Sequence, residues 1–298
     1  MTLDVLPAEA NAAVNPAVEA RSFLFVPATR PERYSKALAS GAGAVIIDLE
    51  DAVSPGEKNA ARDQLAAGFA ALSAVDRRRV LVRINASETA WHADDLKLVS
   101  QLAMLDGALA GVVLSKAESA AQLAQAAAFL GEPAARIALF PLIESAAGLD
   151  ALAAIASAPG VKRLMFGNLD FQADLGMACD ADEAELQPAR FQVVLASRRT
   201  GLAAPVDGVT PGTGDLAQVA KDAARGRRGG FGGKLCIHPS QVAAVNAAHA
   251  PTDKEIAWAH RVVEGDAAAG GGVFTLDGRM VDAPVLRLAR RVLASASI

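Results

Sequence analysis

Residues 45–53 read VIIDLEDAV and set the architecture expected of the whole chain. The apolar run before Asp48 suits a strand that is buried on both faces, as in a parallel sheet. Three carboxylates, those of Asp48, Glu50 and Asp51, stand at the end of this strand. Side chains alternate along a strand, so Asp48 and Glu50 point to the same side. Because acids this close repel one another and lose solvation, the sequence predicts a cationic partner from elsewhere in the chain.

Strand-like runs alternate with helical runs along the chain. We expect eight strands, over residues 22–28, 45–51, 79–85, 111–116, 136–144, 161–169, 203–207 and 234–238. The helices expected among them cover residues 31–41, 54–72, 91–104, 117–131, 145–157, 182–199 and 215–225. Such alternation implies right-handed βαβ units and a parallel sheet. The count and the chain length favour an α/β fold of the closed (β/α)8 TIM-barrel type over an open doubly wound sheet.

The chain is expected to have three parts. They are a flexible N-terminal arm over residues 1–20, a TIM-barrel catalytic domain over 21–250 and a C-terminal extension over 251–298. In the extension, the dipeptide Asp277-Gly278 lies between the runs VFTL and RMV, which is a strong signal for a two-residue hairpin. A helix precedes this hairpin, and Asp282 and Pro284 begin a last one. The extension is therefore expected to be a helix-hairpin-helix unit.

Composition excludes several classes of protein. The chain has 298 residues, of which 52% are hydrophobic, so it can bury a large core. A net charge of −4 argues against nucleic acid as a partner. No run is long and apolar enough to cross a membrane, and residues 1–20 lack the features of a secretory signal. The two cysteines, Cys179 and Cys236, are too few for a disulfide framework, so we expect a cytoplasmic location.

Polar residues gather at the ends of the expected strands. In barrel enzymes the active site lies at the carboxyl ends of the strands. The residues expected there are Asp48, Glu50, Asp51, Arg83, Asn85, Lys116, Glu144, Asp170, Asp207 and His238. One such residue is usually a cap or a solvated turn, but ten at one rim predict a functional site.

Two of these carboxylates favour a metal ion. Glu144 follows the apolar run LFPLI and Asp170 follows LMFG, with no His or Cys nearby in sequence. Mg²⁺ takes one or two protein carboxylates together with water and substrate oxygens, whereas Zn²⁺ prefers His and Cys. For Glu144 alone, an interaction with the dipole of the following helix is the alternative. The pair predicts a magnesium site.

Arg83 is the predicted partner of the acidic cluster. Its guanidinium can bind a carboxylate through two parallel hydrogen bonds. A purely structural pair is the alternative, and the two are compatible: Glu50 or Asp51 can orient Arg83 while its other donors hold a substrate carboxylate. A metal ion and an arginine at one rim suggest a 2-oxo acid as the ligand. The ion would act as a Lewis acid on its carbonyl group.

With these residues in view, the chain resembles the HpcH/HpaI aldolase superfamily, and within it the CoA-ester lyases similar to the citrate lyase β subunit. The likeness runs from about Arg21 to Ala294. The matching segments are RSFLFVPATRPERYSKALASGAGAVIIDLEDAV, LVRIN, GVVLSKAES, LFPLIESAAGL, LMFGNLD, KLCIHPSQV and GRMVDAP. The resemblance implies a magnesium-dependent TIM-barrel enzyme. It would cleave or form the C–C bond of a 3-hydroxyacyl thioester or of a related 3-hydroxy acid.

The resemblance also implies roles for single residues. Glu144 and Asp170 would hold Mg²⁺, and Glu144 would thereby contact the substrate. Arg83 would bind the carboxylate of the oxo acid, with Glu50 and Asp51 supporting it.

Other implied roles concern CoA and a second subunit. In relatives that act on CoA esters, the Asp of the GxMVDxP segment comes from a neighbouring subunit and acts in acid/base chemistry; here it is Asp282. This implies a homo-oligomer, a trimer or a hexamer. Arg30 and Lys36 could meet the phosphates of CoA, with simple surface charge as the alternative.

Two segments depart from the family pattern, and both could shift the choice of substrate. The segment FGNLD, residues 166–170, lacks the small residue and the acid that relatives commonly carry before the Asp. The segment VPATR, residues 26–30, lacks a common Gly. Three activities therefore stay open: a CoA-ester lyase, an aldolase of free hydroxy-oxo acids, and a citrate lyase β subunit that needs an acyl-carrier protein. Asp282 favours the first.

Overall fold

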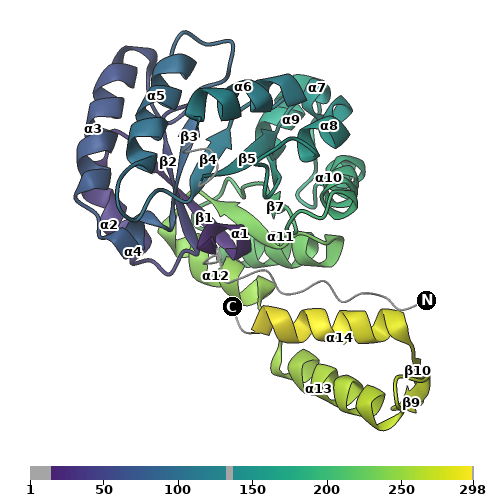
Figure 1. The fold of residues 1–298 in the computed structure, drawn as a ribbon. Coiled ribbons are helices and arrows are strands. Elements are labelled where there is room, and N and C mark those ends of the chain that lie inside the picture. The colour runs from purple at the N-terminus through teal and green to yellow at the C-terminus, as the bar shows by residue number, and fades with distance from the viewer. Residues whose placement is uncertain (1–14, 132–136, 297–298) are drawn as a thin grey trace. The chain divides into compact units, whose positions relative to one another are not determined.

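Eight parallel strands form a closed barrel in the order of the sequence, with β1 beside β8 (Figure 1). The computed structural model describes residues 15–131 and 137–296. The strands are β1 Ser22–Pro27, β2 Ala44–Asp48, β3 Val80–Ile84, β4 Gly111–Leu114, β5 Ala138–Ile143, β6 Met165–Phe166, β7 Val206–Asp207 and β8 Gly233–Cys236. The predicted TIM barrel is confirmed, because β1 pairs with β8 and closes the parallel sheet, which an open doubly wound sheet would not do.

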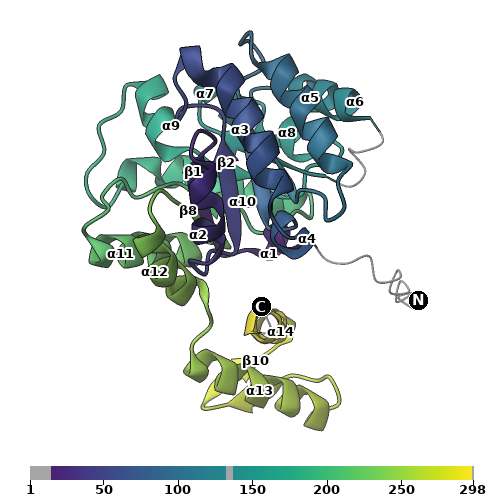
Figure 2. The ribbon, with the colours of Figure 1, turned by 90° about the vertical axis from the view of Figure 1, so that its left-hand side faces the viewer.

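Helices surround the strands (Figures 1 and 2). They are α1 Pro16–Glu19, α2 Tyr34–Leu38, α3 Lys58–Ala70, α4 Ala74–Arg77, α5 His92–Ala103, α6 Ala120–Leu130, α7 Ala146–Asp150, α8 Leu152–Ala156, α9 Asn168–Leu175, α10 Gln187–Arg199, α11 Leu216–Gly229 and α12 Pro239–His249. Short 3-10 turns η1 Pro31–Arg33, η2 Pro55–Glu57 and η4 Ala184–Leu186 precede α2, α3 and α10. The sequence did not predict α1, α4, α9 or α12.

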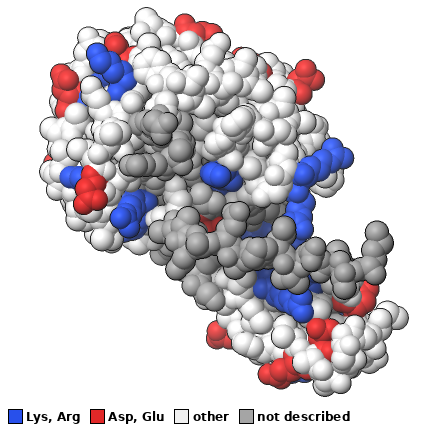
Figure 3. Space-filling view, in the orientation of Figure 1, with Lys and Arg blue, Asp and Glu red and all other residues white. Residues whose placement is uncertain are grey.

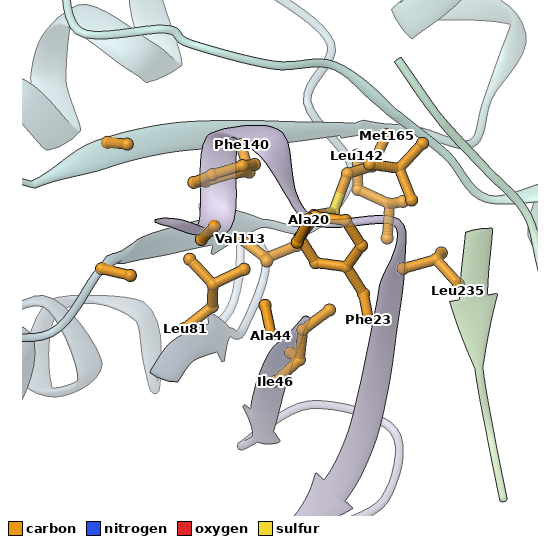
Figure 4. Packing of buried hydrophobic residues seen from close by; sticks show 14 residues of the cluster. Ala20, Phe23, Ala44, Ile46, Leu81, Val113, Phe140, Leu142, Met165 and Leu235 are labelled. Carbon is orange, nitrogen blue, oxygen red and sulfur yellow. The ribbon is translucent and has the colours of Figure 1, made fainter. Parts of the chain in front are cut away.

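The barrel interior is filled by side chains from all parts of the sheet. Phe23 and Phe140 meet edge to face, with ring centroids 6.3 Å apart, and Ile46, Met165 and Leu235 point toward them (Figure 4). These residues come from five different strands, so the barrel core forms only when the sheet closes. In the closed barrel the carboxyl ends of all eight strands lie at one rim, which is where the active site of a barrel enzyme forms.

The expectation of a flexible arm over residues 1–20 is wrong for its last six residues; residues 1–14 lie outside the described part of the chain. Asn15 accepts a hydrogen bond from the Ala17 N–H and donates to the carbonyl of Ala110 at 2.6 Å. Ala17 is fully buried within the barrel core. The buried guanidinium of Arg163 donates to the carbonyls of Val18 and Ala20, at 2.9 and 2.6 Å. This segment therefore closes the amino-terminal end of the barrel.

Replacing Arg163 tests that closure. Arg163 also donates to the carbonyl of Ala204 at 2.6 Å, so Arg163→Met leaves three carbonyls without their charged donor. We expect the free energy of unfolding in urea to fall by about 3 kcal/mol. Arg199→Met, at an exposed position in the last turn of α10, serves as the control. Equal unfolding free energies for the two variants would contradict a structural role for Arg163.

The C-terminal residues form a second compact unit, Ala247–Ile298, against a predicted boundary at residue 251. It contains α13 Asp253–Ala268, β9 Phe274–Leu276, β10 Arg279–Val281 and α14 Ala283–Ala296. The hairpin turn has positive φ at both central residues, 49° at Asp277 and 73° at Gly278, as a type I′ turn requires. Asp282 begins α14 by accepting a hydrogen bond from the Val285 N–H at 3.3 Å. The helix-hairpin-helix order is as predicted.

Surface features agree with the composition. Within the described ranges no helix is long and apolar enough to span a membrane. Cys236 is buried and Cys179 is partly exposed, and both are free thiols. On the barrel face in Figure 3, basic and acidic side chains are scattered among uncharged ones.

Candidate active site

A cavity of about 390 Å³ opens at the carboxyl ends of the barrel strands. Its lining includes Arg83 from β3, Glu144 after β5 and Asp170 in α9. The structure thus brings together the three residues that the sequence proposed for metal and oxo-acid binding. Asp48 and Asp51 line the same cavity.

Arg83 is the centre of the acidic cluster. Asp48 and Arg83 occupy paired positions on β2 and β3. Arg83 Nε donates to one carboxylate oxygen of Asp48 at 2.7 Å, and Nη2 donates to the other at 2.6 Å. Its Nη1 lies 2.7 Å from Glu50 Oε2 and 3.3 Å from Asp51 Oδ2. The main partner is therefore Asp48, whereas the sequence had favoured Glu50 or Asp51.

The cluster holds more negative than positive charge. Burial alone would lower the pKa of Arg83. The nearby carboxylates outweigh this effect, first Asp48 and then Glu50 and Asp51, so the pKa of Arg83 lies above its ordinary value. Burial raises the pKa of Glu50 to about 7, opposed by Arg83 and reinforced by Asp51 and Asp48. Arg83 also stacks over the ring of Phe25, 4.8 Å from its centroid. One guanidinium is thus fixed in place by several acids and one aromatic face.

Buried polar side chains hold the loop that carries Glu50. Lys58, in the first turn of α3, donates to the carbonyls of Leu49 and Glu50 and to Asn85 Oδ1, each at 2.7 Å. Asp95 accepts from the backbone N–H and the side-chain amide of Asn85, at 2.9 and 2.6 Å. Sequence reasoning listed Asn85 but missed Lys58 and Asp95. No spacing marks Lys58, because two of its acceptors are main-chain carbonyls.

Glu144 is buried, with 3% of its surface exposed. It directly precedes Ser145, which caps α7 by accepting a hydrogen bond from the Gly148 N–H at 3.1 Å. Glu144 Oε1 accepts a hydrogen bond from the Lys116 N–H at 2.7 Å, and Lys116 has a left-handed backbone with φ of 46°. A Cβ at Gly167 would lie 2.6 Å from Glu144 Oε2, so only glycine leaves room there. The Glu144 carboxylate is therefore held from both sides.

The electrostatics of Glu144 fit a divalent cation. Burial raises the pKa of this carboxyl to about 8, with Glu50 and Asp170 adding to the rise and the Lys116 N–H and Arg83 opposing it. Such a group needs a proton or a cation beside it to be neutralised. Asp170 supplies a second, exposed carboxylate to the same cavity. Glu144 and Asp170 are therefore the residues that would hold Mg²⁺.

The setting of Asp170 differs from the expectation. The sequence placed it just past a long sixth strand, before a polar loop. The structure ends β6 at Phe166 and puts Asp170 in the first turn of α9. In the described part of the chain, no three His, Cys, Asp or Glu side chains gather as a metal-binding group. Two carboxylates are enough for Mg²⁺, which keeps water and substrate oxygens as its other ligands.

Asp207 is structural rather than part of this cavity. It is fully buried and accepts hydrogen bonds from Arg190 Nε and from the Gly208 N–H, both at 2.9 Å. Burial raises its pKa, but Lys234 and Arg190 outweigh that effect and hold the pKa below its ordinary value. Lys116 lines a separate hollow beside Glu50 and Asp51. The residues predicted at the rim therefore fall into two groups: some line the main cavity, and others lie outside it and support the structure around it.

A second cavity, of about 480 Å³, lies between β1, α2 and the end of β8. Most of its lining is apolar, but it also includes the side chains of Arg33, Lys36 and His238. Lys36 is one of the two residues that the resemblance suggested for the CoA phosphates, and Arg33 was missed. Arg30, also predicted, does not line this cavity but donates from Nε to Glu32 at 2.6 Å on the surface.

Comparison with known proteins decides the family. A model of the HpcH/HpaI aldolase/citrate lyase family matches residues 21–239, and one described as a C-C bond lyase of the TIM-barrel fold matches residues 204–298. The chain belongs to the HpcH/HpaI aldolase/citrate lyase family. This membership makes it a carbon–carbon lyase, in agreement with the resemblance drawn from its motifs.

Relatives within this family match along nearly the whole chain. A citrate lyase subunit beta-like protein of Deinococcus radiodurans is 37% identical over 281 residues, 92% of this chain and 96% of that protein. A (3S)-malyl-CoA thioesterase of Cereibacter sphaeroides is 32% identical over 279 residues, 93% of this chain and 94% of its own. A crystal structure of CitE from Mycobacterium tuberculosis, in complex with magnesium, acetoacetate and coenzyme A, has a TM-score of 0.78 and 36% identity. It covers 93% of this chain and 98% of that one.

Proposed function

We propose that this protein is a Mg²⁺-dependent lyase that cleaves or forms a 3-hydroxyacyl-CoA ester, such as malyl-, citramalyl- or citryl-CoA. The products of cleavage are an acyl-CoA and an oxo acid. The observation that carries this proposal is the convergence of Glu144, Asp170 and Arg83 on one cavity. The related CitE structure, which holds magnesium, an oxo acid and coenzyme A, supports it.

The roles follow from the geometry of the cavity. Glu144 and Asp170 would hold Mg²⁺, which would act as a Lewis acid toward the oxygens of the oxo acid. Arg83, fixed by Asp48 and oriented by Glu50 and Asp51, binds the oxo-acid carboxylate. In cleavage a base takes the proton of the 3-hydroxyl group, the C2–C3 bond breaks, and its electron pair forms the thioester enolate, which is then protonated at C2. Condensation reverses these steps, beginning with removal of a proton from the acyl-CoA methyl group.

Asp282 of a neighbouring subunit is proposed to deliver the proton to C2 in cleavage and to remove it in condensation. This makes the enzyme a homo-oligomer, a trimer or a hexamer, in which residues 251–298 complete the next subunit's site. The family resemblance of the GRMVDAP segment supports this assignment. A cytoplasmic location is proposed with it, since both cysteines are free thiols.

Mixed oligomers test the sharing of Asp282. We expect Asp282→Asn and Glu144→Gln to be inactive alone. Mixed oligomers should recover about a third of the activity if they are trimers and about a quarter if they are hexamers, because these are the fractions of sites with both groups intact once single-variant oligomers are removed. Asn is as good a helix cap as Asp, so α14 keeps its start. Steady-state rates of purified mixed oligomers, sorted by two affinity tags, give the readout. Mixed oligomers without activity would rule out a shared site.

The second cavity, which Arg33 and Lys36 line, is proposed to hold the phosphates of CoA. Lys36→Ala and Arg33→Ala should each raise KM for the CoA ester about fivefold with little change in kcat, because each removes one charged contact to a remote part of the substrate. Arg30→Ala should have a smaller effect, since Arg30 does not line this cavity and lies 2.6 Å from Glu32 Oε1, whereas Arg33 lines the cavity and lies 3.8 Å from the same oxygen. KM values measured at several salt concentrations check this prediction. A larger effect from Arg30 than from Lys36 would move the CoA site elsewhere.

Thioester hydrolysis is the second candidate activity, since one relative is named a (3S)-malyl-CoA thioesterase. A hydrolase releases free CoA and the intact hydroxy acid, whereas a lyase releases an acyl-CoA and an oxo acid. The test is purified protein assayed against malyl-, citramalyl- and citryl-CoA, with and without Mg²⁺, with all products measured. Mg²⁺-dependent release of an oxo acid supports the lyase. Activity only with an added acyl-carrier protein, or only with free hydroxy-oxo acids, would refute it.

A further inference from the structure

We infer that the cavity selects a 2-oxo acid with a single carboxylate and a small alkyl substituent, in preference to a dicarboxylic oxo acid or to one with no substituent. The inference rests on the proposed function, because it concerns the oxo acid that this function requires. It is based on where charged and apolar side chains lie on the cavity wall.

The charged side of the cavity provides for one carboxylate. Among the described residues that line it, Arg83 is the only basic side chain. Its Nη1 already faces Glu50 and Asp51, and its Nη2 is bonded to Asp48. The first turn of α9 also lies at the cavity and has N–H groups that helix geometry leaves unpaired. Together these donors suit one carboxylate. The described lining residues include no second cation that could bind another carboxylate.

The rest of the wall is apolar. The wall is lined by Phe25, Leu142, Val209, Leu235 and Ile237, which come from four separate segments of the barrel. Leu142 and Leu235 are buried, whereas Ile237 is 40% exposed at the end of β8. A methyl or ethyl group against such a wall gains contact, whereas a carboxylate there loses its hydration without a partner.

The main chain of this wall has few donors to offer. Asn168 binds both polar backbone groups of Val209, accepting from its N–H at 2.9 Å and donating to its carbonyl at 3.1 Å. The N–H of Ile237 donates to Gln241 Oε1 at 2.9 Å. A second carboxylate at this wall would therefore have to break an existing hydrogen bond to find a donor.

Leu169 extends the apolar character to the cavity mouth. It lines the cavity from the first turn of α9 and is 44% exposed. A leucine kept in contact with solvent at this place suits an alkyl substituent of the ligand rather than a charged one.

Calorimetric binding of oxo acids in the presence of Mg²⁺ tests the inference without turnover. The probes are pyruvate, 2-oxobutyrate, glyoxylate and oxaloacetate. We expect pyruvate or 2-oxobutyrate to bind about tenfold more tightly than glyoxylate and oxaloacetate, the range that one or two methylene contacts provide. Tighter binding of oxaloacetate or glyoxylate would overturn the inference and leave the proposed function standing. Failure of all four to bind with Mg²⁺ would overturn both.

An added cation provides the matched test. Ile237→Lys places a positive charge at the exposed end of the apolar wall, and Ile237→Gln changes polarity without charge. We expect Ile237→Lys to shift the ratio of oxaloacetate to pyruvate affinity about tenfold toward oxaloacetate, and Ile237→Gln to leave the ratio within about twofold of the original protein. The same shift in both variants, or none in either, would contradict the view that a missing cation excludes the second carboxylate.

Discussion

Glu144→Gln and Asp170→Asn should each lose measurable Mg²⁺ binding and lower kcat by about a thousandfold. The loss corresponds to about 4 kcal/mol of transition-state stabilisation, within the range of several kcal/mol that a Lewis-acid metal supplies. Glutamine at position 144 has the shape of glutamate and can still accept the hydrogen bond from the Lys116 N–H, so the fold persists. Calorimetry with Mg²⁺ or Mn²⁺ and steady-state kinetics on the same preparations check both parts.

The control for these variants is Asp150→Asn. Asp150 is an exposed carboxylate at the end of α7, six residues after Glu144 and outside the cavity lining. It should keep the original metal affinity and kcat. Wild-type affinity for Mg²⁺ in Glu144→Gln would remove the assignment of this residue as a ligand.

Arg83→Lys should weaken binding of the oxo acid about a hundredfold and leave Mg²⁺ affinity nearly unchanged. Lysine keeps the positive charge but cannot bind both oxygens of Asp48 and still keep a donor for the oxo acid, and one charged hydrogen bond contributes about 1.5–3 kcal/mol. Its charge still compensates part of the Asp48, Glu50 and Asp51 cluster, so the variant should fold. The measurements are calorimetric affinities for Mg²⁺ and, at saturating Mg²⁺, for pyruvate.

Arg79→Lys is the matched control. Arg79 directly precedes β3, and its Nη2 donates to the carbonyls of Leu38 and Ala42, away from the cavity lining. Its replacement should not change affinity for the oxo acid. Equal effects of the two variants, or a parallel loss of metal and oxo-acid binding in Arg83→Lys, would show that Arg83 acts only through the fold.

Local patterns predicted the barrel because strands and helices are marked by short-range periodicity. The hairpin at Asp277-Gly278 was predictable for the same reason, since the turn chemistry lies within two residues. The N-terminal segment was not predictable. Its carbonyls at Val18 and Ala20 bind Arg163, which lies 145 and 143 residues away in sequence. Helix α9 was missed because its sequence NLDFQADL has no clear apolar stripe.

The candidate site shows the same limit. Glu144, Asp170 and Arg83 were predictable because each follows an apolar run that marks a strand or lies within one. The bidentate pairing of Asp48 with Arg83 depends on the register of β2 against β3, which no pattern in the sequence gives. The left-handed turn at Lys116, which presents its N–H to Glu144, was likewise hidden, because lysine rarely adopts positive φ.

The most direct test is a crystal structure of the protein soaked with Mn²⁺ and pyruvate, with the ion located by its anomalous scattering. We expect one strong peak, about 2.0–2.2 Å from carboxylate oxygens of both Glu144 and Asp170, with the pyruvate carboxylate in hydrogen-bonding distance of Arg83. An ion bound elsewhere, or bound to only one of the two carboxylates with pyruvate turned away from Arg83, would contradict a shared metal and oxo-acid site at this barrel mouth.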